Sequence, residues 1–192
     1  MVPFIERWID IFWLAVIVLL TLAAFTSKRS VQRQSGGSRF LQASLVAIGA
    51  SLIFNLAPGF SRGWFADRVI PLRTSWVIAG TALTLLGILF AVWARVTLGR
   101  NWSGVVTIKQ DHELILRGPY TVVRHPIYTG ILFALLGTAL VYGCARCFVG
   151  LLLCGVAFWL KLRIEECFML QQFGEQYTEY RQRTRALVPF VL

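Results

Sequence analysis

The chain is short of charged residues, and acidic residues are the scarcer kind. Only 15% of its 192 residues are charged, whereas an average soluble domain has about a quarter. Nine residues are acidic, and none of them lies in 11–66, 68–110 or 114–164. The hydrocarbon core of a membrane excludes carboxylates in this way because an unpaired charge there is costly. With a mean hydropathy of +0.66, the composition argues against a soluble protein and predicts a polytopic membrane protein.

The sequence also lacks motifs that would give its net charge of +10 a role in nucleic-acid binding. It contains no zinc-finger spacing, no aromatic motif of an RNA-binding strand and no basic helix. Cys144 and Cys147 form a C-x-x-C pair, but no second pair and no nearby histidine completes a zinc site. We predict that these two and Cys154 and Cys167 are small buried apolar residues, with no metal bound.

The N-terminal segment lacks the order of a cleaved signal peptide. Its first seven residues, M-V-P-F-I-E-R, carry no net positive charge, and the basic residues follow the apolar run. We interpret the first 26 residues as an uncleaved transmembrane helix.

What the sequence does contain is five apolar segments, which predict an all-α integral membrane fold with about five transmembrane helices. They are 8–25, 40–57, 75–94, 127–142 and 144–160. A span needs about 20 residues, with a lower limit near 17, so the last two are short. A turn at Tyr142-Gly143 makes them a helical hairpin. Residues 163–183 are predicted to form an amphipathic tail that lies at the interface or folds back as a cap.

The distribution of Lys and Arg predicts the orientation of the chain. Of the 19 basic residues, 14 lie in 27–39, 95–125 and 161–185, which fall on the same side of a five-span protein. The richer side is expected to be cytoplasmic. The N-terminus would then be outside, and the C-terminus and every motif described below would be cytoplasmic.

Residues 117–130, R-G-P-Y-T-V-V-R-H-P-I-Y-T-G, gather polar groups at the start of an apolar segment. Gly118-Pro119 predicts a fixed turn, and Pro126 disfavours helical geometry at His125, which should mark a helix boundary. His112 and His125 are the two histidines of the chain. Taken alone they are a solvated loop residue and a helix-end residue, but the rigid aromatic and proline setting favours a functional site.

Two further features have both a structural and a functional interpretation. Glu165 and Glu166 are a charge cluster at a helix end or part of a site, and adjacent helical residues point about 100° apart. We therefore expect one to face a ligand and the other to face Arg163 or Arg124. Arg95, at the end of the third apolar segment, is a functional intramembrane arginine or a positive-inside stop.

Taken in order, the motifs resemble one known family, the isoprenylcysteine carboxyl methyltransferases and their prokaryotic relatives, over 93–190. The matching motifs are L-G-R-N-W (98–102), H-E-L-I-L-R-G-P-Y (112–120), R-H-P-I-Y-T-G (124–130), E-E (165–166), F-G-E-Q-Y-T-E-Y (173–180) and L-V-P-F (187–190). The resemblance implies an integral-membrane methyltransferase that uses S-adenosylmethionine without a Rossmann fold. The absence of any G-x-G-x-x-G unit agrees with this.

The resemblance also implies roles for particular residues. A glutamate, Glu165 or Glu166, would contact the cofactor's polar groups, and Lys161 or Arg163 would be the basic residue near the substrate. Arg124 would steady a glutamate. The catalytic set is therefore expected to be Arg163, Lys161, Glu166 and Arg124. The cofactor pocket is expected to include His112, Leu114, Ile115, Tyr120, His125, Pro126, Ile127, Tyr128, Glu165 and Glu166.

The predicted reaction is carboxyl O-methylation of a prenylated-cysteine-like substrate that enters from the lipid bilayer. Methylation of small thiols or phospholipid amines fits the same motifs. An NADPH-dependent membrane reductase and a non-catalytic membrane protein are further alternatives. We expect N-terminal helices over 1–92 and a catalytic region over 93–192, with membrane lipids but no nucleic acid as partners.

Overall fold

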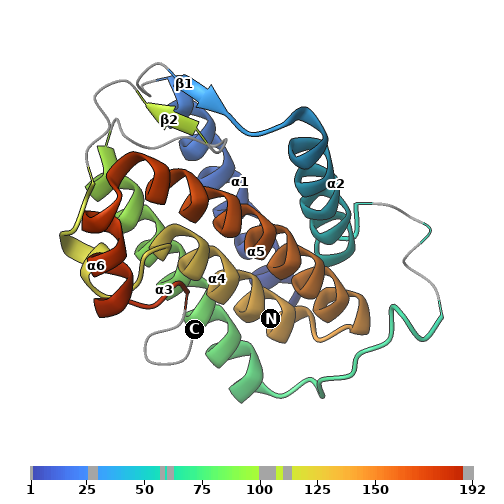
Figure 1. Cartoon of the computed structure of the whole chain (residues 1–192). Coiled ribbons are helices and arrows are strands. Elements are labelled where there is room, and N and C mark those ends of the chain that lie inside the picture. The colour runs from blue at the N-terminus through green and yellow to red at the C-terminus, as the bar shows by residue number, and fades with distance from the viewer. Residues whose placement is uncertain are drawn as a thin grey trace.

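The computed structural model describes residues 2–25, 30–56, 59, 63–99, 107–109 and 114–187 of the chain. Long helices dominate this part (Figure 1). In chain order the elements are α1 (Val2–Phe25), β1 (Ser30–Arg33), α2 (Gly36–Ile53), α3 (Thr74–Leu98), β2 (Thr107–Lys109), the 3-10 helix η3 (Gly118–Thr121), α4 (Pro126–Tyr142), α5 (Ala145–Phe173) and α6 (Glu175–Arg183).

The predicted helical fold is confirmed, with one addition. Strands β1 and β2 form a short antiparallel pair in which Ser30 opposes Lys109 and Arg33 opposes Thr107. A strand within the basic segment 27–39 was not predicted. A pair this short has no apolar alternation that a sequence pattern could reveal.

Helix boundaries follow proline and glycine. Pro126 occupies the first turn of α4, where its missing N–H is not needed. Gly143 ends that helix in the left-handed conformation at φ 64°, and its N–H donates to the Ala139 carbonyl. Helix α5 continues past the predicted end at residue 160 as far as Phe173. Gly174, at φ 50°, then separates it from α6.

Helices α3 and α4 are antiparallel and pack with their backbones in close contact. A Cβ atom added to Gly130 would lie 2.5 Å from the Gly87 carbonyl oxygen, so only glycine fits there. The buried Thr84 hydroxyl donates to the Gly80 carbonyl at 2.9 Å and lies 3.3 Å from the Ala134 carbonyl. Small residues at the contact, with hydroxyls that bond to backbone, are the usual means of packing helices in a membrane.

Helices α2 and α5 form the second packed pair and lie side by side in Figure 1. Their close contact is at Gly49 and Gly150, where a Cβ added to Gly150 would lie 2.5 Å from the Gly49 carbonyl oxygen. Helix α1 packs elsewhere in the bundle. Its Trp13 ring nitrogen donates to the buried Thr138 hydroxyl on α4 at 3.0 Å.

Among the described residues, α3 and α5 are long and apolar enough to cross a membrane, and α4 is a shorter apolar helix. Side chains on the outer face of α3 are exposed, including Leu86 (64%) and Val96 (71%), while Gly80 and Thr84 face α4. An apolar exterior over a core of small residues is the pattern expected in lipid. Of the five predicted spans, these two are supported by length and composition.

Candidate active site

Five charged or aromatic side chains meet where the start of α4 lies against the middle of α5. They are Arg124, His125, Tyr128, Glu165 and Glu166, which we call the carboxylate cluster. His125 is the residue before Pro126 and, at φ −120° and ψ 58°, it lies outside the helical region that proline disfavours for its predecessor. The hairpin of α4 and α5 thus brings together two motifs that are about 40 residues apart in the sequence.

His125 lies between the two carboxylates. Its Nδ1 is 3.4 Å from Glu165 Oε2, and its Nε2 is 3.4 Å from Glu166 Oε1. The prediction that the two adjacent glutamates face different partners was wrong in this respect. The two nitrogens lie on different edges of the imidazole ring, so one ring contacts two carboxylates that diverge from the helix.

Glu166 is also held by arginine. Arg124 Nε lies 2.7 Å from Glu166 Oε1, and the side chains of this pair are only 10% and 11% exposed. Arg181 Nε, on α6, lies 3.6 Å from Glu166 Oε2. The Arg124 guanidinium also donates to the Thr184 carbonyl. Arg124 therefore steadies a glutamate, and it does so from a position fixed by the chain that follows α6.

Tyr128 holds the second glutamate. Its hydroxyl donates to Glu165 Oε1 at 2.6 Å. Its ring stacks with the ring of His125, at a centroid distance of 5.6 Å, and with that of Phe158, at 5.0 Å. Lys161 Nζ lies 5.3 Å from the centre of the same ring. Tyr128 thus joins the carboxylate cluster to the face of α5 that carries Phe158 and Lys161.

The segment after α6 folds back over the cluster. The backbone N–H groups of Arg124 and His125 donate to the carbonyls of Arg185 and Ala186, at 2.8 and 3.0 Å. The Tyr180 hydroxyl donates to the Tyr120 carbonyl at 2.6 Å. The predicted tail, 163–183, is itself helical, as the end of α5 and as α6, and its placement at the interface or as a cap stays a prediction.

The cluster favours a protonated imidazole. Burial lowers the pKa of His125, but Glu165 and Glu166 outweigh this effect and bring the net pKa above its ordinary value. At 3.4 Å, His125 Nε2 makes an electrostatic contact with Glu166 and no aligned hydrogen bond. This buried nitrogen is left without a hydrogen-bond partner in the described part of the chain.

The other residues predicted for a cofactor pocket are partly brought together. Tyr120 and Ile127 are buried with Ala94 in one apolar cluster. Ile115 and Tyr128 pack against it. Pro126 is buried and Leu114 is half-buried. His112 lies outside the described residues, as do Asn101-Trp102 of the L-G-R-N-W motif and 188–190 of the last one.

The two candidate substrate cations have different surroundings. Lys161 is half-buried beside Tyr128. Arg163 is exposed and lies over the Trp159 ring at 5.9 Å. Arg95 is buried and donates to the Gly99 carbonyl at 2.8 Å, in the last turn of its own helix.

The cysteines are free thiols. Cys147 and Cys154 are buried, as predicted, and Cys144 is half-buried, but Cys167 is exposed on the outer face of α5, so that prediction was wrong. Within the described ranges, no group of three or more His, Cys, Asp or Glu residues is arranged to hold a metal ion.

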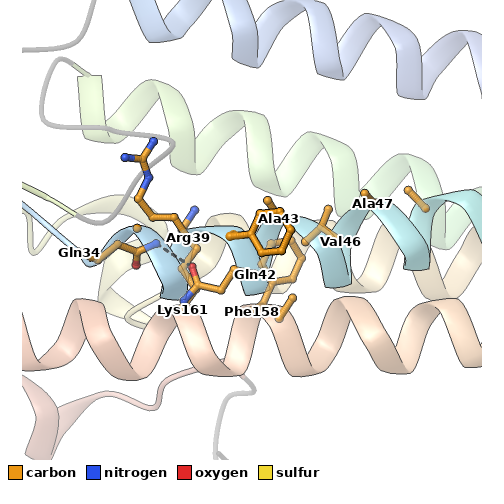
Figure 2. Close-up of a pocket in the computed structure, with 12 residues that line it drawn as sticks. Gln34, Arg39, Gln42, Ala43, Val46, Ala47, Phe158 and Lys161 are labelled. Carbon is orange, nitrogen blue, oxygen red and sulfur yellow. Dashed lines mark hydrogen bonds between the residues drawn. The ribbon is translucent and has the colours of Figure 1, made fainter.

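A cavity of about 770 Å³ lies between α2 and α5 (Figure 2). We call it the α2–α5 groove. Its volume is in the range of small-molecule sites. Its apolar wall consists of Phe40, Ala43, Val46, Ala47 and Ala50 from α2, with Ala157 and Phe158 from α5.

Polar groups gather at one end of the groove, which we call its mouth. They are Gln34, Arg39, Gln42 and Lys161. Figure 2 shows Gln34, Gln42 and Lys161 at this end and Ala47 toward the other. Gln34 Nε2 donates to Gln42 Oε1 at 3.0 Å. Within the described residues, the buried Gln34 Oε1 accepts no hydrogen bond.

This groove was not predicted from the sequence. The signal was present, because Ala43, Ala47 and Ala50 have the spacing of one helical face. Alanines at that spacing are more often a packing face, and here they line a cavity. Lys161 and Phe158 belong both to the groove and to the surroundings of Tyr128.

Comparison with known proteins identifies the family. A family model described as phospholipid methyltransferase matches residues 75–176, a little over half of the chain. A probable protein-S-isoprenylcysteine O-methyltransferase from Oryza sativa subsp. indica is 32% identical over 139 residues, which cover 71% of this chain and 68% of the rice protein. The chain belongs to the isoprenylcysteine carboxyl methyltransferase family. This family member is also 33% identical to protein-S-isoprenylcysteine O-methyltransferase B of Arabidopsis thaliana, over 62% of its own chain.

A solved structure has the same fold. The eukaryotic intramembrane Ras methyltransferase, an isoprenylcysteine carboxyl methyltransferase, matches 84% of this family member with a TM-score of 0.54 and 23% identity. This match covers 55% of that solved chain, and the match to the Arabidopsis protein covers 64% of that protein's length. Family and fold, together with the apolar helices, make this an integral membrane protein. Helix α2 precedes the region matched by the family model.

Proposed function

We propose that the protein transfers a methyl group from S-adenosylmethionine to the carboxylate of a prenylated-cysteine-like substrate. One observation carries the proposal: the carboxylate cluster and the α2–α5 groove meet at Tyr128, Phe158 and Lys161. A polar site suited to a charged nucleoside donor therefore adjoins a groove suited to a hydrophobic acceptor.

The carboxylate cluster fits the donor by charge and shape. Glu166 is already paired with Arg124, so Glu165 would supply the carboxylate that meets the cationic groups of the donor, and the stacked rings of His125 and Tyr128 offer a planar surface. The buried His125 Nε2, which lacks an aligned acceptor in the described part, is a donor available to a ligand carboxylate. We infer that these residues, with Tyr120, would hold S-adenosylmethionine, and that Leu114, Ile115, Pro126 and Ile127 would form the apolar surroundings.

The mouth of the groove fits a carboxylate acceptor. Lys161 and Arg39 both line it, from α5 and α2, whereas Arg163 is not among its lining residues. We infer that Lys161 is the cation that orients the substrate carboxylate, with Arg39 as a second positive charge. The Gln34 carbonyl oxygen at the same mouth is available to accept an N–H of the substrate's cysteine.

The apolar wall fits a hydrocarbon tail. Exposed apolar side chains flank the groove on both helices, including Phe40 (76%) and Ile48 (49%) on α2 and Val156 (42%) and Trp159 (42%) on α5. These side chains are where lipid would contact the protein. A lipid-anchored substrate could therefore pass from the bilayer into the groove without crossing water.

Methyl transfer depends more on the alignment of the carboxylate with the methyl group than on a general acid or base. S-adenosylmethionine, when bound, supplies a methyl group on a sulfonium, which an ionised carboxylate accepts by in-line displacement without proton transfer. The task of Lys161 and Arg39 is to hold that carboxylate in one orientation. Lipid beside the exposed apolar wall would exclude water from the groove, which would strengthen these contacts.

The orientation predicted from Lys and Arg places the carboxylate cluster on the cytoplasmic side, where a water-soluble donor is available. The exposed Cys167 lies next to Glu166 and provides a test. In sealed right-side-out vesicles, a membrane-impermeant maleimide should label Cys167 only after permeabilisation. Labelling of Cys167 in intact vesicles would contradict the predicted orientation and place the cluster on the outer side.

Methyl transfer from labelled S-adenosylmethionine tests the function itself. The acceptors are N-acetyl-S-farnesylcysteine, small thiols and vesicles that contain phosphatidylethanolamine. Label in the farnesylcysteine as a methyl ester is the expected result. Label in the thiols or the phospholipid alone would replace the proposed acceptor with one of the alternatives.

Donor binding is tested separately by calorimetry on detergent-solubilised protein. We expect binding of S-adenosylhomocysteine but not of NADPH, and weaker binding in His125→Ala and Glu166→Ala. Cys144→Ser, which lies at the other end of α5, should bind as the wild type does. Binding of NADPH alone would favour a reductase.

A further inference from the structure

The α2–α5 groove is closed at the end opposite its mouth. At Gly49 an added Cβ atom would lie 2.7 Å from both the Gly150 carbonyl oxygen and Cys154 Sγ. The two helices are in backbone contact there, and no space remains between them. From this contact toward Lys161 they diverge, and the cavity lies in the space between them.

The long wall of the groove is a row of alanines on α2. Ala43, Ala47 and Ala50 line the cavity, at the spacing of one helical face. Opposite them are Ala157 and Phe158 of α5. Alanine is the smallest side chain with a Cβ, so a larger residue at any of these positions would protrude into the cavity.

We propose that the alanine face of α2 sets the longest prenyl tail that the protein accepts. This inference rests on the proposed function, because it takes the groove as the site of the acceptor's tail. It assigns tail selectivity to a helix that lies outside the region matched by the family model.

The occupant is identified by charge. Arg39 and Lys161 at the mouth place two positive charges where the tail joins the head group. These charges attract the carboxylate of a prenylcysteine, which is the methyl acceptor, whereas in a phospholipid amine they would attract the phosphate and leave the acceptor ammonium beyond it. The head of a prenylcysteine would stay at the mouth, and its tail would run along the alanines toward Gly49.

The length of the wall selects the tail. From Arg39 to Ala50, α2 rises about 16 Å at about 1.5 Å per residue. An extended chain advances about 1.2 Å per bond, so this wall accommodates about 14 bonds. A farnesyl tail fits within this length, a geranyl tail is shorter, and a geranylgeranyl tail is longer. From Arg39 to Ala47 the wall is about 12 Å, which holds a geranyl tail only.

Alanine-to-leucine substitutions measure this length directly. The acceptors are N-acetylcysteines with S-geranyl, S-farnesyl or S-geranylgeranyl tails, and kcat/KM is measured for each in wild type and variants. Ala47→Leu should lower kcat/KM for the farnesyl acceptor about 10–200-fold relative to the geranyl acceptor, the range for one misfit in an apolar pocket. Ala43→Leu, which is nearer the mouth, should lower kcat/KM for all three acceptors.

Ala82→Leu is the matched control. Ala82 is exposed on α3, away from the groove, and the same substitution there should leave all three values unchanged. Val46→Ala makes the opposite change, because Val46 lines the groove and its truncation enlarges it. It should raise kcat/KM for the geranylgeranyl acceptor relative to the farnesyl one, because a wider groove lets the longer tail bend before the closed end at Gly49, and this keeps the test open if a leucine variant does not fold.

The outcomes separate this inference from the proposed function. Wild-type protein that methylates none of the prenyl acceptors contradicts the proposed function. If the wild-type protein is active and Ala47→Leu lowers kcat/KM equally for the three acceptors, or for none of them, the inference is overturned. Label that appears in phosphatidylethanolamine, with a loss in Ala47→Leu, overturns the choice of occupant.

Discussion

The pair α3–α4 and the pair α2–α5 use small residues to opposite effect. Between α3 and α4 the close contacts recur along the helices, at Gly80 and Gly137 and again at Gly87 and Gly130. Between α2 and α5 the contact is at Gly49 and Gly150, and alanines line a cavity toward the other end. The first pair is sealed and the second is a wedge-shaped opening.

The difference shows how one fold can combine a tightly packed helix pair with a helix pair that leaves a cavity. The sealed pair fixes the start of α4, and with it His125 and Tyr128, against the bundle. The open pair places Phe158 and Lys161 beside them without filling the neighbouring space. Four predictions test this contrast, in order of expected effect.

The largest effect should come from filling the sealed contact. Gly130→Leu would drive a side chain into the Gly87 backbone, where even a Cβ atom would lie 2.5 Å from oxygen. We expect little or no folded protein, because overpacking costs about 1–3 kcal/mol even where neighbours can move. Gly155→Leu is the control, since nothing lies within 4 Å of its added Cβ atom. Equal yield and equal unfolding temperature for the two variants would show that α3 and α4 are not sealed.

The next effect concerns the carboxylate cluster. Glu166→Ala leaves Arg124 nearly buried without its carboxylate, and breaking such a pair costs about 3–5 kcal/mol. We expect a lower unfolding temperature in detergent and at least a 100-fold loss of methyl transfer, since misplaced groups in a site cost about that factor. Glu179→Ala removes an exposed glutamate paired with Arg183 and should change neither quantity. A Glu166→Ala variant as stable and active as Glu179→Ala would contradict the assignment.

A smaller effect distinguishes the two basic residues of α5. Lys161→Ala should raise KM for a farnesylcysteine acceptor at least tenfold, because a charge-assisted contact contributes about 1.5–3 kcal/mol. Arg163→Ala should change KM less than twofold, since this arginine is exposed and lies outside the groove. The affinity of both variants for S-adenosylhomocysteine should equal that of the wild type, which shows that the donor site is intact. The reverse ranking of the two KM values would move the substrate cation to Arg163.

The smallest effect is on stability as pH changes. His125 has a raised pKa in the folded protein, so its contribution is complete below its ordinary value of 6.5. That contribution declines as pH rises from 6.5 through the folded-state pKa. Unfolding temperature should therefore fall over this window in wild type and less steeply in His125→Gln. Parallel profiles would show that the imidazole is not held protonated between the glutamates.

Much of the fold could be predicted from residues that act locally. The apolar runs indicated α3, α4 and α5, and Pro126 and Gly143 marked where α4 begins and ends, because each restricts or relaxes its own backbone. The C-terminal part of α5 was harder to bound, since its apolar periodicity gives way to charge before the helix ends at Gly174.

The site was predictable only in part. The family resemblance placed His125 and a glutamate in one pocket, and the cost of unpaired charge in an apolar chain left Arg124 or Arg163 as the partner of a glutamate. The contact of one imidazole with both glutamates depends on ring geometry that sequence spacing does not contain. The groove was missed because a cavity depends on how two helices diverge, and that is set at Gly49 and Gly150, away from its lining residues. Cys167 was predicted to be buried because cysteine usually is, whereas its position on the outer face of α5 exposes it.

In the proposed function, the carboxylate cluster and the α2–α5 groove act on one substrate carboxylate. The most direct measurement compares N-acetyl-S-farnesylcysteine with its carboxamide, which has the same tail but no carboxylate, as acceptors of labelled methyl from S-adenosylmethionine. We expect a methyl ester from the acid and no product from the amide. Equal labelling of the two, or labelling of neither while phosphatidylethanolamine is methylated, would contradict it.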